Sequence, residues 1–127
     1  MLLKYICSAF VAVFILMAGP VMGEQAPRFL SVIEDLPLMF ELHEVGEGVQ
    51  FSSPQGRIAE VTTQGHVKQA AVLAFYERTL PQLGWVQVNR GRFIREDETL
   101  ELVIEEKGPK LSVRFSLAPT IAKNRPD

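Results

Sequence analysis

Apolar and polar residues alternate with a period of two in the C-terminal part of the chain, and this pattern constrains the fold most. On either side of Gly108-Pro109, every second side chain is a large aliphatic or aromatic one. Successive side chains of a strand point to opposite faces, so the pattern predicts two antiparallel strands, Thr99 to Glu106 and Lys110 to Leu117, with one face buried. The side chains of that face are Leu100, Leu102, Ile104, Leu111, Val113, Phe115 and Leu117.

Two shorter strands are predicted before this pair, at Trp85 to Asn89 and at Arg92 to Glu96. Arg90-Gly91 separates them, and the acidic turn Glu96-Asp97-Glu98 leads into the next strand. Connections this short join antiparallel neighbours, so the four strands predict a meander.

A hairpin is predicted further upstream. Its strand candidates are Gly48 to Phe51 and Arg57 to Thr63, and the second of these is rich in β-branched residues. Between them, residues 52–56 contain the serine, proline and glycine that are typical of turns.

Between the hairpin and the meander, the apolar period becomes that of a helix. Side chains at offsets of 3, 4, 7, 8 and 11 from Val72 share one helical face. We expect the helix to start near Val67 and to end or kink between Arg78 and Leu83. The reasons for this end are Pro81, which lacks an amide donor, and Gly84, which suits a left-handed terminal position. The residues on the face are Val72, Phe75, Tyr76, Thr79, Leu80 and Leu83.

The order of strand, strand, helix and four strands predicts an α+β fold, with a single antiparallel β-sheet covered on one face by one amphipathic helix. This domain is expected over residues 48–118, after an acidic lead-in segment at 24–47 and before a flexible tail at 119–127. In the lead-in segment, the apolar patch Leu36 to Phe40 either packs onto the domain or docks onto another molecule. We favour packing, because a free patch promotes aggregation. The expected core is Ile58, Val61, Val72, Phe75, Tyr76, Leu80, Leu83, Val86, Val88, Leu102, Ile104, Val113 and Phe115.

Residues 1–23 have the three-part layout of a secretory signal peptide. Lys4 and the amino terminus are positive, Tyr5 to Ala18 is apolar, and Val21-Met22-Gly23 offers small residues for cleavage. The apolar run would span about 21 Å as a helix, against roughly 30 Å of hydrocarbon in a bilayer. We therefore expect export to the periplasm with cleavage near Gly23. The alternative is an uncleaved N-terminal membrane anchor.

The composition excludes several classes of function. The chain has 127 residues, 13 Lys+Arg against 15 Asp+Glu, and a formal net charge of -2. Without Lys4, the exported part has about 12 bases against 15 acids, a charge of about -3, which disfavours nucleic-acid binding. The only cysteine, Cys7, lies in the leader, so the exported part has no disulfide, cysteine metal site or thiol nucleophile.

The residues indicate no catalytic, metal or cofactor site. His43 and His66 are far apart in the sequence and have no metal-ligand spacing around them. The serines lie in no nucleophile motif, and no glycine-rich loop leads from a strand into a helix. The carboxylates of Glu96-Asp97-Glu98 lie in a turn, where solvation explains them. We therefore expect no enzyme and no cofactor, and a small carboxylate-dependent hydrolase is the least favoured alternative.

The segment from Val72 to Trp85 resembles one found in small exported bacterial proteins of uncharacterised function. In those proteins Val-x-x-Phe-Tyr precedes Leu-Pro-x-Leu-Gly-Trp and then a β meander. The resemblance covers residues 36–118, including Leu36-Pro37-Leu38-Met39 and Ser53-Pro54-x-Gly56-Arg57-Ile58. It implies a fold and an envelope location, but no chemistry.

Three arginines, Arg90, Arg92 and Arg95, surround one predicted hairpin, and Arg114 of the last strand could join them. Such a group is a candidate contact for a phosphate, a lipid headgroup or an acidic partner surface. The alternative is that these arginines form solvated cross-strand pairs with nearby acids. Those acids are Glu96, Asp97, Glu98 and Glu101.

These observations favour a non-catalytic exported domain of the bacterial envelope that acts through protein–protein contacts with an envelope partner. The alternative function is binding of an anionic ligand, a lipid headgroup or a cell-wall fragment by the arginine hairpin, with peripheral membrane contact. The sequence indicates neither the partner nor the oligomeric state.

Overall fold

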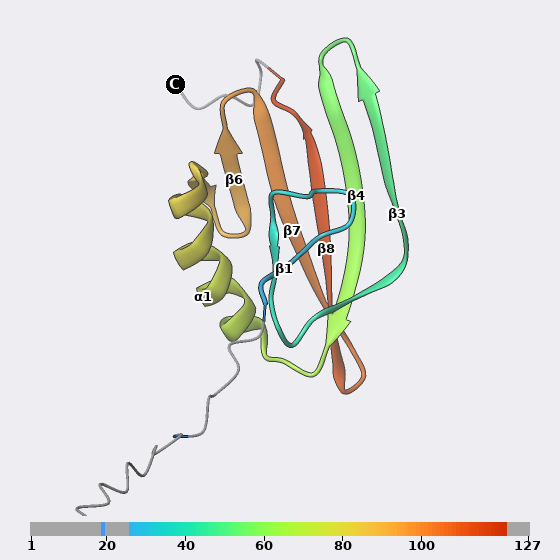
Figure 1. Cartoon of the computed structure of the whole chain (residues 1–127), viewed down its shortest axis with the longest axis vertical. Coiled ribbons are helices and arrows are strands. Elements are labelled where there is room, and N and C mark those ends of the chain that lie inside the picture. Colours follow the sequence, from blue (N-terminus) through green and yellow to red (C-terminus); the bar gives the residue numbers. More distant parts are fainter. Residues whose placement is uncertain (1–18, 20–25, 122–127) are drawn as a thin grey trace, which may run out of the picture.

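A six-stranded antiparallel sheet forms the body of the protein in the computed structural model, which describes residues 19 and 26–121. Its strands lie in the spatial order β3-β4-β8-β7-β6-β5 (Figure 1). Helix α1 (Gln69–Thr79) and a short 3-10 turn, η1 (Leu80–Leu83), connect β4 to β5. The strands are β3 (His43–Ser53), β4 (Gly56–Gly65), β5 (Val86–Asn89), β6 (Arg92–Arg95), β7 (Glu98–Lys107) and β8 (Lys110–Pro119).

The α+β class, the antiparallel pairing and the order of these elements agree with the sequence prediction, but the prediction of a single sheet is wrong. A second sheet of two strands, β1 (Arg28–Phe29) and β2 (Pro37–Leu38), lies in the lead-in segment. Strands of two residues are too short to show a period of two, and the prolines at 27 and 37 interrupt any longer pattern. The sequence therefore carried no signal for the second sheet.

The alternation in β7 and β8 places their apolar side chains on one face, as predicted. Leu102 pairs with Phe115 and Leu100 with Leu117, and all four are buried. The intervening side chains point to the other face of the sheet, which we call the open face. There Glu101 lies opposite Ser116. The predicted meander is confirmed for β5 to β8, and β8 continues through Pro119 into the predicted tail.

The helix ends where the sequence predicted. After Thr79 the chain tightens into η1, and Gly84 then adopts a left-handed conformation with φ 89°. The Trp85 amide donates to the Leu80 carbonyl at 3.1 Å, which turns the Trp85 side chain into the core. Because the helical period stops at Leu80, Leu83 is not in the core and is 40% exposed.

Five other members of the predicted core are not fully buried. Val86 is 64% exposed, because its pairing with Ile94 places it on the open face. Four more predicted core residues are only half-buried, and Phe75 is among them. The other three are Ile58, Val88 and Ile104.

The lead-in segment crosses the inner face of the sheet and completes the core beside α1 (Figure 1). Leu36 and Met39 are buried, so the patch Leu36 to Phe40 packs onto the domain as expected, whereas Phe40 itself is 64% exposed. The five lead-in side chains in the core are Leu30, Ile33, Leu36, Met39 and Leu42.

Tyr76 of α1 anchors the lead-in segment by hydrogen bonds and packs against the sheet. Its hydroxyl accepts a hydrogen bond from the Met39 amide at 3.2 Å and donates one to the Pro37 carbonyl at 2.9 Å. Its ring packs edge-on against Phe115, with centroids 5.2 Å apart. Burial raises the pKa of Tyr76 far above its ordinary value, so the hydroxyl keeps the proton that it donates.

Gly65, the last residue of β4, allows the lead-in backbone to cross at close range. A Cβ atom at this position would collide with the backbone carbonyl of Glu41. Since the obstacle is backbone, a side chain here could be accommodated only by moving the crossing segment.

Apart from Gly19, the predicted signal peptide lies outside the described residues, as do residues 122–127 of the predicted tail. Within the part of the chain that the structure describes, no helix has the length and apolar character needed to span a bilayer.

We predict that Tyr76→Phe lowers the free energy of unfolding by about 1–3 kcal/mol, because it leaves the Met39 amide and the Pro37 carbonyl without their partner. Urea titration followed by circular dichroism measures the change. Phe51→Ala is the control, since Phe51 is 52% exposed, and it should cost less than about 0.5 kcal/mol. Equal losses in the two variants would contradict the anchoring role.

We predict that Gly65→Ala destabilises the fold by about 1–3 kcal/mol, because the added methyl group displaces the crossing backbone at Glu41. Thermal melts of this variant and of His66→Ala, a change at the exposed neighbouring residue, provide the comparison. If Gly65→Ala has the same melting temperature as the wild type, the close approach of the Glu41 backbone to Gly65 is wrong.

Candidate functional site

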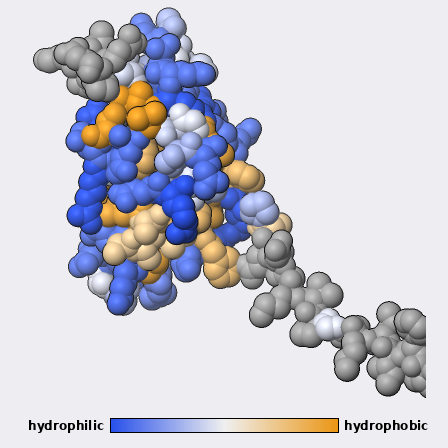
Figure 2. All heavy atoms as spheres, turned by 90° about the vertical axis from the view of Figure 1, so that its left-hand side faces the viewer, coloured by the Kyte–Doolittle hydropathy of each residue, from blue (hydrophilic) through white to orange (hydrophobic). Residues whose placement is uncertain are grey.

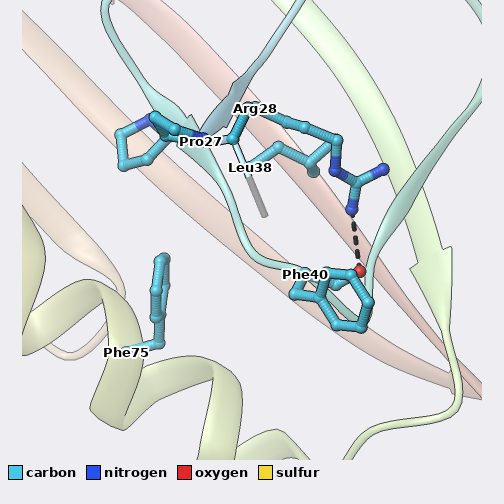
Figure 3. A pocket seen from close by; sticks show the side chains of 7 residues that line it. Pro27, Arg28, Leu38, Phe40 and Phe75 are labelled. Carbon is cyan, nitrogen blue, oxygen red and sulfur yellow. Dashed lines mark hydrogen bonds between the residues drawn. The ribbon is translucent and has the colours of Figure 1, made fainter. Parts of the chain in front are cut away.

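An apolar hollow of about 340 Å³ opens between the lead-in segment and α1 (Figure 3). Phe40 and Phe75 reach it from opposite sides, the first from a turn of the lead-in segment and the second from the helix. Pro27 and Leu38 also border it. The complete lining is Ala26, Pro27, Arg28, Pro37, Leu38, Phe40 and Phe75.

A second hollow, of about 480 Å³, adjoins the first at Phe40 and Phe75. We call the two hollows together the Phe40 groove. Figure 2 shows the side of the molecule that α1 occupies, and there hydrophobic side chains interrupt a largely hydrophilic surface both near the top and in the lower part of the domain. The second hollow is lined by Met39, Phe40, Glu41, Ala71, Ala74, Phe75 and Arg78.

The local fold explains why Phe40 is exposed. A tight turn, closed by the Leu42 amide donating to the Met39 carbonyl at 3.0 Å, directs Met39 and Leu42 into the core. Phe40 lies between them and points outward. On α1, Tyr76 takes the inward position, and its neighbour Phe75 is left at the border, with its ring edge-on to Tyr76 at 4.8 Å.

Arg28 places a positive charge at the first hollow. Its Nη2 donates to the carbonyls of Phe40 at 2.7 Å, Leu42 at 3.1 Å and Met39 at 3.4 Å, and the guanidinium lies 5.8 Å from the centre of the Phe40 ring (Figure 3). These bonds hold the guanidinium in place without neutralising it. Arg78 adds a second positive charge at the second hollow. Among the described residues, no carboxylate forms an ion pair with either arginine.

The structure does not gather the four arginines that the sequence singled out. Arg92 and Arg95 lie on opposite faces of β6: Arg92 pairs with Glu101 on the open face, and Arg95 points to the inner side. Arg114 lies on the open face of β8, separated from β6 by β7. Arg90 is exposed in the turn between β5 and β6. The odd spacing of positions 92 and 95 already implied opposite faces.

Arg95 belongs to a neutral network of two arginines and two acids at one end of the sheet. It donates through Nη2 to Asp35 and lies 3.6 Å from Glu98. Arg57 donates to Glu98 at 2.7 Å and to Asp35 at 3.3 Å. The Arg95 guanidinium also lies 4.3 Å from the centre of the Trp85 ring. Arg95 therefore pairs with a nearby acid, Glu98, as the alternative interpretation of the sequence expected, and Asp35 and Arg57 extend this pair. The network joins the lead-in segment to three strands of the sheet, β4, β6 and β7.

The groove offers contact surface and charge, but no reacting group. Its lining holds two guanidinium groups and one carboxylate, and no serine, histidine or tyrosine hydroxyl. Within residues 19 and 26–121, no group of three or more histidine, cysteine, aspartate and glutamate side chains is placed to hold a metal ion. The arrangement therefore suits recognition of an apolar partner with negative charge.

Comparison of the chain with protein-family models, with curated proteins and with solved structures gave no significant match. The groove was not found from the sequence, although Arg28 is the only basic residue between positions 24 and 47 and Phe40 ends an apolar patch there.

We predict that Asp35→Asn weakens the acid sensitivity of the fold. Partial burial alone would raise the pKa of Asp35, but the hydrogen bond from Arg95 and the charges of Arg57 and Arg95 outweigh it, so the pKa lies below its ordinary value of 3.8. A lowered pKa stabilises the fold above the unfolded value, and this stabilisation is lost as pH falls through the folded value.

Melting temperatures between about pH 6 and pH 3 test this prediction. The difference between wild type and Asp35→Asn should shrink below about pH 5, and it should be worth no more than about 1 kcal/mol because the Asp35 side chain is 41% exposed. Glu47→Gln, at an exposed position of β3, is the control. A difference that stays constant with pH would show that the Asp35 charge does not stabilise the network.

Proposed function

We propose that this protein is a non-catalytic exported domain of the cell envelope, that it acts by binding another protein, and that the Phe40 groove is its contact surface. The observation that carries the proposal is the exposure of Phe40, 64%, beside Arg28 in an apolar groove. Aromatic and arginine side chains are the residues most enriched at the energetic centres of protein interfaces.

The fold supports this choice of surface. The turn that buries Met39 and Leu42 also holds Phe40 outward, and Arg28 binds the carbonyls of that same turn. Little conformational entropy is therefore lost when a partner covers Phe40. The export step of the proposal is supported by the signal-peptide layout of residues 1–23.

The alternative, an anion site made by the arginine hairpin with contact to a membrane surface, has less support. Arg92 and Arg95 already have carboxylate partners and face opposite sides of β6. An anion that approached either arginine would have to compete with a carboxylate already in place.

We predict that a photo-crosslinking amino acid at position 40 captures one protein partner in growing cells. The full-length chain carries p-benzoylphenylalanine in place of Phe40, or of Val86 in the control, and adducts are identified by mass spectrometry. The positions are matched, because each native side chain is 64% exposed, but Val86 lies on the open face. A single adduct at position 40 and none at position 86 supports the proposal. No adduct at position 40, or the same adducts at both positions, would contradict it.

A further inference from the structure

We infer that the occupant of the Phe40 groove is a segment of the partner protein in which apolar side chains lie between acidic residues. This inference rests on the proposed function and adds the chemistry of the partner. It follows from how charge is distributed around the groove and elsewhere on the domain.

The groove has an apolar centre with a positive charge on each side. Phe40 and Phe75 border both hollows, Arg28 lines only the first, and Arg78 lines only the second. An occupant that places an apolar side chain against Phe40 therefore has one guanidinium group available on each side. Carboxylates are the protein groups that complement such a pair.

The two groove arginines differ from Arg57, Arg92 and Arg95 in having no carboxylate partner among the described residues. Arg57, Arg92 and Arg95 each form an ion pair with a carboxylate of the domain. Within the described part of the chain, Arg28 donates only to backbone carbonyls, and no side-chain bond of Arg78 is formed. Neither guanidinium is therefore paired with a carboxylate of the described residues, and both lie beside the apolar surface of the groove.

The sign of the groove is opposite to that of the whole protein. Arg28 and Arg78 outweigh Glu41, the one carboxylate in the lining, whereas the chain has a formal net charge of -2. An acidic segment is therefore repelled by the molecule in general and attracted at the groove. Such an arrangement favours one orientation of the partner and disfavours non-specific contact.

A peptide segment fits these observations better than a membrane surface does. Binding to anionic lipid headgroups usually relies on clusters of several basic residues. Here two arginines lie around two separate hollows, and Glu41 would face the same headgroups. Two adjoining apolar hollows, of about 340 and 480 Å³, instead leave room for apolar side chains of a bound segment on either side of Phe40.

A displayed library of random linear peptides, selected on protein purified from cells that express the full-length chain, tests the inference. Selected peptides should combine aromatic or aliphatic residues with Asp or Glu. Their affinity should fall about tenfold in Arg78→Glu and should weaken with added salt. Arg90→Glu is the matched control, because Arg90 is also exposed and forms no ion pair among the described residues; it should bind like the wild type.

Arg28→Gln should also weaken binding, and Arg28→Lys should restore part of it, provided that melting temperatures show both variants folded. Arg78→Glu keeps the test decisive if the Arg28 variants unfold, since the Arg78 side chain forms no hydrogen bond or ion pair in the described structure. Neutral or basic selected peptides, or affinities unchanged by Arg78→Glu, would overturn the inference. The inference would also be overturned if no peptides were selected and the protein instead bound phosphatidylglycerol vesicles in a way that Arg78→Glu abolishes.

The crosslinking experiment at position 40 separates failure of this inference from failure of the proposed function. If an adduct forms at position 40 with the same yield in an Arg78→Glu background, the groove still binds a partner, and only the acidic character of the occupant is wrong. If no adduct forms at position 40, the proposed function and this inference are both wrong.

Discussion

The hydrogen bonds of the Tyr76 hydroxyl anchor the lead-in segment to the helix and so close the core. By binding the Met39 amide and the Pro37 carbonyl, this one group fixes the lead-in segment at β2, while its ring packs on Phe115 of the sheet. In this arrangement β2 pairs with β1, the lead-in side chains cover the inner face, and Phe40 projects outward. The candidate site is thus a direct result of how the core is closed.

The lead-in segment is held at two further points, and each uses a different kind of interaction. At Gly65 the constraint is steric, because only the absence of a side chain lets the backbone at Glu41 pass so closely. At Asp35 the constraint is electrostatic, because one carboxylate lies between Arg57 and Arg95. A segment fixed by a buried hydroxyl, a close backbone crossing and an ion-pair network is an integral part of the fold.

The sequence predicted the elements whose signal is periodic and missed those held by single contacts. The meander and the end of the helix between Arg78 and Leu83 followed from alternation and from turn chemistry, and both are confirmed. The second sheet could not be predicted, because its two-residue strands are too short to show a period. The groove could not be found, because Phe40 and Phe75 are 35 positions apart in the sequence and only the tertiary fold brings them to one hollow. The predicted signal peptide, the export step and the absence of an enzyme stay predictions.

Stability and recognition are linked in this protein through Arg28. Its guanidinium binds the carbonyls of the turn that exposes Phe40, so the residue that shapes the apolar surface also supplies charge beside it. Arg78 supplies charge at the second hollow, and within the described residues its side chain forms no hydrogen bond or ion pair. The Arg78 charge lies in the last turn of α1, where a cation is favourable, but it has no carboxylate partner among the described residues. In the function that we propose, a second molecule contacts this charge and the exposed Phe40 together.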